Sequence, residues 1–361
     1  MTAMAQHTIF YVGTYTRTTS EGIYVSRMDN AAGAVEQLSV IGGIDNPSFV
    51  ALDPRGERLY AVSEIDEFEG EASGAVYAYA ISPGSGALTF LNRQPTGGPG
   101  PCHLTVDATG RYVVVANYQG GSVCMLPVGP DGSLEPMSDF VQHEGSSVNE
   151  RRQDGPHAHS VNVDANNRFL FAPDLGMDKV IVYRPDLASG KLVPNDVPFV
   201  RAEPGAGPRH FAFHPSGGHA YVINELASTI TAYRHDAGAG TLLELRTVST
   251  LPEGYSGRSF TADLHIHPNG RFLYGSNRGH DSIAIFEIDG ELGALTRVGI
   301  EPTHGVNPRN FAISPNGKFL LAENQDSDSI VTFQIDPATG ELSPTGDIAN
   351  IPMPVCIAFA T

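Results

Sequence analysis

Four side chains of this sequence have the chemistry of an acid–base site for an anionic substrate. Arg209 and Glu225 stand sixteen residues apart, and His159 and Arg278 occupy comparable places in other copies of a repeated segment. Arginine binds carboxylate or phosphate through a planar fork and keeps its proton. Glutamate can remove a proton, and histidine can act as acid or base near neutral pH. We therefore predict Glu225 as general base, His159 as acid or base, and both arginines as stabilisers of developing negative charge.

The same residues also allow a structural interpretation. Glu225 could form an ion pair with Arg209 or Arg278 that ties neighbouring repeats together and takes no part in catalysis. Spacing alone does not separate the two interpretations, so both stay open.

The elements that must position these residues belong to a sequence repeat. Seven segments share one pattern: PSFVALD from Pro47, PCHLTVD from Pro101, AHSVNVD from Ala158, PRHFAFH from Pro208, TADLHIH from Thr261, PRNFAIS from Pro308 and PVCIAFA from Pro354. Successive copies start 54, 57, 50, 53, 47 and 46 residues apart. This spacing is typical of a four-stranded β unit with short turns.

Two more β-rich runs, a turn that closes on glycine and a fourth strand follow each complete copy. The turn glycines are Gly86, Gly132, Gly190, Gly240, Gly293 and Gly340. The first unit is split, because the N-terminal run from Ile9 supplies its second to fourth strands and the C-terminal segment from Pro354 supplies its first. We therefore predict an all-β, seven-bladed β-propeller of four-stranded antiparallel blades, a single domain over residues 1–361. The N- and C-terminal strands share one blade and close the ring.

Strand alternation predicts which side chains reach the central channel. The fourth position of the first strand is apolar in every copy and should pack between blades, whereas the third and fifth should face the channel. Antiparallel order brings the start of the first strand and the end of the second to one mouth, where the four candidate catalytic residues and Glu64 should meet. The candidate substrate-binding residues are His103, His157, His210, Asp263, Arg309, Arg258, Arg152, Asn117 and Gln325.

The two longest connections between blades are expected at this same mouth. Glu144 to Pro156 carries Arg152, and Ser249 to Ser259 carries Arg258. Loops of this length are often functional lids, although a plain surface excursion is an equally good interpretation.

Composition limits the partners. Forty acidic against 22 basic residues give a net charge of −18 at pH 7, which argues against nucleic-acid binding. No basic, apolar leader is visible and no window reaches the ~20 apolar residues of a membrane span. We expect a cytoplasmic protein that does not bind membranes, either a monomer or a weak homo-oligomer.

The three cysteines, Cys102, Cys124 and Cys356, predict no disulfide framework and no zinc knuckle.

Longer strings resemble the lactonase-type seven-bladed propellers over the whole chain. These strings are PHAHS from Pro156, GPRHFAFHP from Gly207, NEL from Asn224, ADLHIHPNGRFLYGSNRGHDSI from Ala262 and NPRNFAISPNGKFLLAENQDSD from Asn307. The family includes bacterial cytoplasmic 6-phosphogluconolactonases and the fungal 3-carboxy-cis,cis-muconate lactonising enzyme. The resemblance implies chemistry on a lactone ring without metal or organic cofactor. It implies that His159, Arg209, Glu225 and Arg278 are the catalytic set, with His157 as an alternative to His159.

Three function classes follow. The first is a carboxylic-ester hydrolase for an anionic sugar lactone, with 6-phosphogluconolactone of the pentose phosphate pathway as the leading substrate. The second is a lactonising cycloisomerase that uses the same groups in the reverse sense. The third is a non-catalytic propeller that binds a partner at its mouth, because fold does not guarantee function.

Two other kinds of site are considered and set aside. His157-x-His159 and His265-x-His267 have the spacing of metal ligands on a strand, but no third ligand is evident, so we expect no metal. Cys102 and His103 are not expected to form a thiol dyad, because adjacent residues of a strand point to opposite faces.

Overall fold

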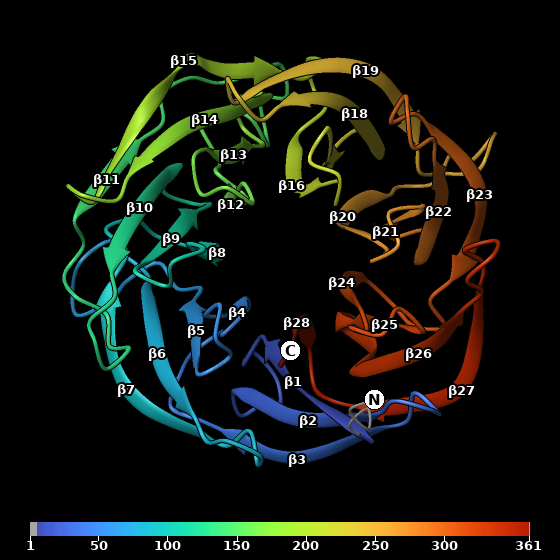
Figure 1. The fold of residues 1–361 in the computed structure, drawn as a ribbon, viewed down its shortest axis with the longest axis horizontal. Helices are drawn as coiled ribbons and strands as arrows, with labels where there is room; N and C mark the ends of the chain where they lie inside the picture. The colour runs from blue at the N-terminus through green and yellow to red at the C-terminus, as the bar shows by residue number, and fades with distance from the viewer. Residues whose placement is uncertain (1–5, 361) are drawn as a thin grey trace.

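Seven four-stranded sheets form a closed ring around a central channel in the computed structural model, which describes residues 6–360 (Figure 1). We number the blades from the split one and give the strands from the channel outward. Blade 1 consists of β28 (Pro354–Phe359), β1 (His7–Thr14), β2 (Ile23–Asp29) and β3 (Val35–Ile41). Blade 2 consists of β4 (Val50–Leu52), β5 (Arg58–Ser63), β6 (Ala75–Ile81) and β7 (Leu88–Pro95). Blade 3 consists of β8 (Pro101–Val106), β9 (Tyr112–Asn117), β10 (Ser122–Pro127) and β11 (Asp139–Gln142).

The remaining four blades follow the same order. Blade 4 consists of β12 (Asn162–Val163), β13 (Leu170–Asp174), β14 (Lys179–Asp186) and β15 (Lys191–Arg201). Blade 5 consists of β16 (Pro208–Phe213), β17 (His219–Asn224), β18 (Thr229–Asp236) and β19 (Thr241–Ser249). Blade 6 consists of β20 (Phe260–Ile266), β21 (Phe272–Arg278), β22 (Ser282–Ile288) and β23 (Leu295–Pro302). Blade 7 consists of β24 (Pro308–Ile313), β25 (Phe319–Asn324), β26 (Ser329–Ile335) and β27 (Leu342–Asn350), with the 3₁₀ turn η1 (Gln325–Ser327) after β25.

The ring closes as predicted. Strand β28 pairs antiparallel with β1, with Val12 opposite Ile357, and β1 continues the blade through β2. The first and last strands in the sequence, β1 and β28, therefore lie side by side in one blade (Figure 1). This arrangement confirms the all-β, seven-bladed fold and the shared closing blade. Across the described part of the chain, no helix has the length and apolar character needed to cross a membrane.

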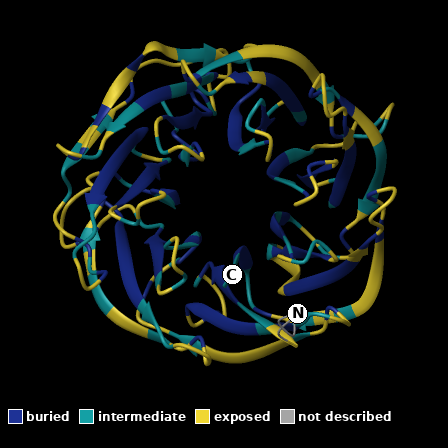
Figure 2. Ribbon diagram, in the orientation of Figure 1, coloured by how far each residue is buried: buried dark blue, intermediate teal, exposed yellow. Residues whose placement is uncertain are grey.

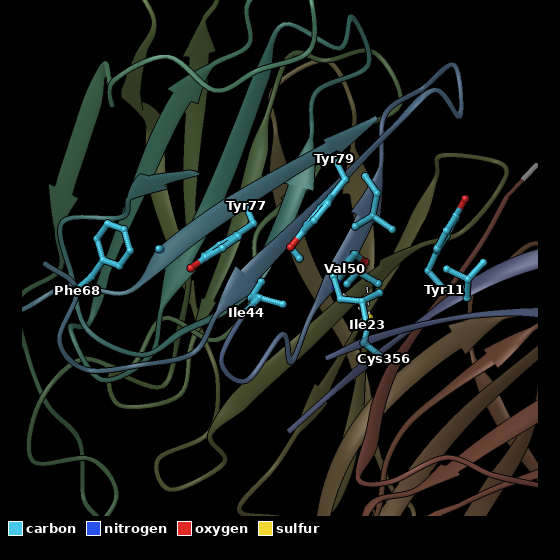
Figure 3. Packing of buried hydrophobic residues seen from close by; sticks show 12 residues of the cluster. Tyr11, Ile23, Ile44, Val50, Phe68, Tyr77, Tyr79 and Cys356 are labelled. Atoms are coloured by element: carbon cyan, nitrogen blue, oxygen red, sulfur yellow. Dashed lines mark hydrogen bonds between the residues drawn. The ribbon is translucent and has the colours of Figure 1, made fainter. Parts of the chain in front are cut away.

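The core lies between neighbouring blades. At the seam of blades 1 and 2, Tyr11 and Ile23 pack with Val50, Tyr77 and Tyr79 (Figure 3). The inner strands are mostly buried, whereas the outermost strands are largely exposed (Figure 2). The predicted packing of the fourth position is thus confirmed at Val50 and in the corresponding clusters.

A tyrosine of the second strand also ties four pairs of adjacent blades together. Its hydroxyl donates to the carbonyl of the turn glycine in the next blade: Tyr11 to Gly86, Tyr60 to Gly132, Tyr221 to Gly293 and Tyr274 to Gly340, at 2.8–3.0 Å. These glycines have φ between 67° and 88°, a region that favours glycine. The turn glycines of the repeat therefore serve both the turn and the contact between blades.

The start of the inner strand is less regular than the repeat predicts. In blade 4 the segment from Ala158 was expected to be a full strand, but β12 spans only Asn162–Val163, and Ala158 makes an isolated bridge to Asp174. One carboxylate oxygen of Asp174 accepts a hydrogen bond from the backbone N–H of His157. The side chain of Asp174 therefore anchors the end of the long loop that precedes blade 4. This side-chain contact adds to the two backbone hydrogen bonds of the bridge, from His159 N–H to the Pro173 carbonyl and from Leu175 N–H to the His157 carbonyl.

Candidate active site

Bulges at the starts of the inner strands aim side chains at one mouth. The register of β8, β16 and β24 shifts at Cys102, Arg209 and Arg309 respectively, so each residue lies outside the regular ladder. A bulge re-aims the side chain that it carries. The ends of the second strands lie beside them, since the backbone N–H of Glu225 donates to the carbonyl of Gly207 at 2.7 Å. The two predicted sets of residues therefore meet.

A cavity of about 220 Å³ lies where they meet. Its lining residues are Glu64, Cys102, Tyr118, Arg152, His159, Glu225, Phe260, Arg278 and Arg309. The structure thus brings together three of the four candidate catalytic residues on the cavity wall. The fourth, Arg209, is 2% exposed and bonds directly to Glu225.

Glu225 is the centre of an ion cluster. Arg152 donates to its Oε1 at 2.6 Å, while Arg209 and Arg278 bind its Oε2 at 3.0 and 2.8 Å. Burial alone would raise the pKa of Glu225, but Arg278, Arg209 and Arg152 outweigh it and hold that pKa well below its usual range. Glu225 is therefore ionised, and the ion pairs of the structural interpretation exist. They tie together blade 5, blade 6 and the loop before blade 4.

Arg209 remains a cation despite its burial. Burial, followed by the charges of Arg278 and Arg309, lowers the pKa of Arg209 to about 9. At neutral pH the guanidinium is still protonated, so its pairing with Glu225 is a true ion pair.

His159 lies next to this cluster as a neutral imidazole. Its Nε2 is 4.0 Å from Oε2 of Glu225, and its Nδ1 is 3.6 Å from Sγ of Cys102. Burial lowers the pKa of His159 well below its usual value, and the charge of Arg209 lowers it further. The cavity therefore holds a neutral base beside an ionised carboxylate.

Arg309 is the cation of the cavity that lacks a protein acceptor. Its guanidinium stacks over the ring of Tyr15, 5.5 Å from the centroid, and makes no hydrogen bond or ion pair within residues 6–360. Glu64 is instead bound by the hydroxyls of Tyr15 and Ser48. Burial alone would lower the pKa of Arg309, but the nearby Tyr15, Glu64 and Glu225 outweigh this effect and raise that pKa. Its N–H donors are free for a ligand.

Three predicted binding residues lie at the mouth but not on the cavity wall. The ring of His157 stacks on Tyr118 at 4.6 Å, and its Nδ1 lies 2.9 Å from the Tyr118 carbonyl. Exposed Arg258 lies over Phe260, 5.0 Å from the ring centroid. Gln325 donates to Asp326. Of the two histidines of PHAHS, it is His159 that lines the cavity.

Asn117 does not reach the cavity at all. It is fully buried, and its amide donates to Ser122 Oγ at 3.0 Å and to the Thr96 carbonyl at 3.2 Å. Asn277, at the same position three blades further on, makes the same kind of bonds, to Ser282 and Thr250. The position is a structural part of the repeat, and the structure does not support a substrate contact there.

Three other candidates lie below the mouth, inside the channel. His103, His210 and Asp263 line a separate cavity of about 330 Å³. His210 donates or accepts at both ring nitrogens, with Asp263 Oδ1 2.6 Å from Nδ1 and Arg209 Nη1 3.2 Å from Nε2. His210 contacts the ion cluster from beneath through Arg209, and none of the three residues lines the cavity at the mouth, the upper cavity.

Sequence reasoning missed Tyr118, Phe260 and Cys102 as cavity residues. Tyr118 lies eight residues after Gly110, which is in the turn between the first two strands of its blade. Glu225 lies eight residues after the equivalent Gly217, so the spacing could have identified Tyr118. Its hydroxyl lies 3.1 Å from Arg152 Nη2. Cys102 occupies the repeat position of Arg209. As expected it forms no dyad with His103, but it does contact His159.

Metal ligands are not grouped in the structure described. No three His, Cys, Asp or Glu side chains among residues 6–360 are placed to hold a metal ion. His267 Nε2 lies 2.8 Å from the Gly317 carbonyl, which gives this histidine a structural contact. Activity without a metal stays a prediction.

Comparison with known proteins places the chain in a family. A family described as "Lactonase, 7-bladed beta-propeller" matches residues 9–359. The chain is 38% identical over 351 residues to a 6-phosphogluconolactonase of Bacillus subtilis, covering 97% of this chain and 98% of that protein. It is 39% identical over 286 residues to a 6-phosphogluconolactonase of Pectobacterium carotovorum, covering 78% and 79%. The solved structure of the Pseudomonas aeruginosa periplasmic gluconolactonase PpgL has a TM-score of 0.93 and 36% identity, covering 98% of this chain and 99% of that one. The chain belongs to the lactonase family of seven-bladed β-propellers.

Proposed function

We propose that this chain is a lactonase that hydrolyses 6-phosphogluconolactone to 6-phosphogluconate. The observation that carries the proposal is the charge of the upper cavity. Three guanidiniums, of Arg152, Arg209 and Arg278, bind Glu225, and a fourth, of Arg309, lies on the wall of the same cavity, in a protein whose net charge is −18. An excess of positive charge in a concave site attracts an anion. The names of the relatives support a lactone.

Arg309 is the group that we assign to the phosphate. Its donors are unused, whereas Arg152, Arg209 and Arg278 already bind Glu225. A free, planar guanidinium matches phosphate oxygens geometrically. Phosphate at Arg309 would leave the lactone ring for the part of the cavity that holds Glu225 and His159.

Hydrolysis then proceeds by addition and elimination. The oxygen of a water molecule bonds to the lactone carbonyl carbon while a base takes its proton. The carbonyl oxygen becomes an oxyanion, which Arg278 stabilises with a donor not used by Glu225. Collapse of this intermediate breaks the bond between carbonyl carbon and ring oxygen, and the proton moves to that ring oxygen. The product is an open-chain hydroxy acid.

Glu225 and His159 are the two groups that can take the proton. In the empty cavity three guanidiniums make Glu225 a weak base, because they stabilise its ionised form. A bound phosphate compensates part of that positive charge and raises the proton affinity of both groups. The assignment of Glu225 as base therefore depends on substrate binding. Because His159 is neutral, it can give a proton to the ring oxygen only after receiving the one that Glu225 has taken, and its Nε2 lies 4.0 Å from Glu225 Oε2.

A phosphorylated substrate also bears on location. A phosphate ester is ionised at neutral pH and does not cross membranes freely, so its lactonase is expected in the cytoplasm, in the pentose phosphate pathway. The periplasmic relative is called a gluconolactonase, without phosphate. Whether this chain requires the phosphate is therefore the point to test.

The test compares 6-phosphogluconolactone with glucono-1,5-lactone, each corrected for uncatalysed hydrolysis. We expect R309Q to lower kcat/KM for the phosphorylated lactone by about 10- to 100-fold, the size of one hydrogen bond to a charged group. Activity on the unphosphorylated lactone should change little. R17Q is the matched control, because exposed Arg17 also stacks on Tyr15, 4.1 Å from its centroid, but does not line the cavity.

Two results would overturn the assignments. If the wild-type chain does not accelerate hydrolysis of either lactone, the proposed function is wrong. If R309Q loses activity equally on both lactones, Arg309 does not bind the phosphate.

A further inference from the structure

The channel below the active site contains a buried chain of polar contacts that ends on Arg209. Asp263 on β20 lies 2.6 Å from Nδ1 of His210 on β16, and Nε2 of His210 lies 3.2 Å from Nη1 of Arg209. Arg209 in turn binds Glu225 through Nε at 3.0 Å. All of these residues are less than 9% exposed. The chain crosses from blade 6 to blade 5 and reaches the ion cluster from beneath.

The bulge in β16 makes the central contact geometrically possible. Adjacent residues of a regular strand point to opposite faces, so their side chains do not meet. The register shift between Pro208 and His210 removes that alternation. Arg209 and His210, neighbours in sequence, therefore contact each other through their side chains.

The partners of His210 determine its tautomer. A guanidinium has only N–H donors, so Nε2 of His210 must offer its lone pair to Arg209. The proton of the neutral ring then resides on Nδ1, where it is donated to the carboxylate of Asp263. Burial, followed by the charge of Arg209, lowers the pKa of His210 to about 4, which agrees with a neutral ring.

Asp263 is itself held by residues of two blades. It accepts from His265 Nε2 at 2.8 Å and from its neighbour Leu264 N–H at 2.9 Å, both on blade 6, and from Asn310 Nδ2 on blade 7. Burial alone would raise the pKa of Asp263, but His265 and His210 outweigh it and lower that pKa. A carboxylate fixed in this way gives His210 one orientation.

Two of the three nitrogens of Arg209 have acceptors in the protein. Nε is used by Glu225, and Nη1 is used by His210 and the carbonyl of Ala262. Nη2 has no acceptor in the described chain. With two of its three nitrogens fixed, the guanidinium plane is fixed, and Nη2 keeps one direction.

We propose that His210 and Asp263 are positioning residues that hold Arg209 against Glu225, and so fix the carboxylate that we assign as base. The inference rests on the proposed lactonase function for its kinetic effect, but not for its structural effect. His210 acts through Arg209 and does not touch the reacting atoms. Loss of the Nε2 acceptor should lower kcat, because a misplaced catalytic group costs rate even when the fold survives.

Two substitutions at His210 separate the two ring nitrogens. In H210Q the side-chain oxygen can replace the Nε2 acceptor for Arg209. In H210N the side-chain amide replaces only the Nδ1 donor to Asp263. We expect H210N to lower kcat by about 10- to 100-fold, with a smaller change in KM, and H210Q to retain most of the wild-type kcat. If kcat falls equally in both variants, or in neither, Nε2 of His210 does not position Arg209.

His214 provides a matched control for stability. It follows the same strand, is 8% exposed against 7% for His210, and also reaches blade 6, where its Nε2 lies 2.8 Å from the Gly270 carbonyl. It lies near the opposite end of the strand from Arg209. We expect H214Q to lose melting temperature without losing kcat per folded molecule. A kcat loss in H214Q equal to that in H210N would contradict the positioning role.

A measurement without substrate distinguishes this inference from the proposed function. In ¹⁵N NMR of the wild-type protein, His210 should show a protonated Nδ1 and an unprotonated Nε2 at neutral pH. D263N should weaken that preference, because the amide is a poorer acceptor than the carboxylate. A protonated Nε2 in the wild type would overturn the inference even if the chain hydrolyses lactones. The expected tautomer without any lactonase activity would instead refute only the proposed function.

Discussion

At the scale of single residues, the candidate site depends on how one carboxylate is shared. Glu225 binds three guanidiniums, and this sharing both fixes their positions and weakens Glu225 as a base. Residue types and repeat spacing were sufficient to predict that His159, Arg209, Glu225 and Arg278 would meet. They did not predict the charge balance, because that depends on Arg152, which reaches Glu225 from a loop whose conformation no repeat specifies.

The substitution E225Q tests the catalytic interpretation of Glu225. If Glu225 is the base, turnover per folded molecule should fall by about 10²- to 10⁴-fold, since the amide cannot take the proton. Stability should fall as well, because the buried guanidiniums lose their counter-ion. The measurement is kcat normalised to the folded fraction at the assay temperature. Near-normal kcat with a lowered melting temperature would leave Glu225 only its role in tying the blades together.

At the scale of elements, the repeat predicted the strands well and their first residues poorly. Hydrophobic alternation and turn glycines located all seven blades. The bulges at Cys102, Arg209 and Arg309 carry no signal in the alternation, because they consist of a local change of register. The rule that adjacent strand residues diverge therefore fails at Arg209, which contacts its neighbour His210. At the equivalent bulge Cys102 contacts His159 of the next blade.

Strand β25 carries an exception of another kind. Glu323 is fully buried, and neither carboxyl oxygen makes a well-formed hydrogen bond with any residue from 6 to 360. The corresponding positions of five other blades are Val62, Ala116, Pro173, Ile223 and Ser276. Burial raises the pKa of Glu323 well above its usual value, and the charge of Asp263 raises it further. The folded protein therefore holds a proton here that the unfolded chain releases.

The sign of this shift predicts the effect of E323Q. Above pH ~4.5 the folded state binds more protons at this residue than the unfolded state, so its contribution to stability falls as the pH rises. Gln does not titrate, so the free energy of unfolding of E323Q should rise relative to that of the wild type as the pH increases. The rise should be up to about 1.4 kcal/mol per pH unit. Denaturant unfolding at pH 5 and pH 7 measures the difference. The exposed Glu287, substituted as E287Q, controls for the change in net charge. A difference that is the same at both pH values would show that Glu323 is ionised in the fold.

At the scale of the whole molecule, the ring determines where chemistry can occur. Seven blades close into a ring that leaves only the outermost strand of each blade as a sheet edge, and they bring every inner strand to one axis. An acidic chain can then gather its arginines at one mouth, where seven strand starts and seven strand ends converge. The closure of the ring was predictable because the seventh copy of the repeat occurs only at the C-terminus. It is also non-covalent, since the strands that join are β1 and β28.

Deletion of residues 354–361 tests that closure. The deletion removes β28, whose Val355, Cys356 and Ile357 are each less than 10% exposed, and it unpairs the inner edge of β1. At about 1.5–3 kcal/mol per buried apolar side chain, the loss approaches the total stability of about 5–15 kcal/mol that is typical of a folded protein. We expect a lower and broader melting transition and reduced solubility, because two sheet faces lose their neighbour. Because closure is non-covalent, a synthetic peptide of residues 354–361 added in trans should restore part of the transition, whereas a scrambled peptide should not. A truncated chain that melts like the full one would show that the ring holds without β28.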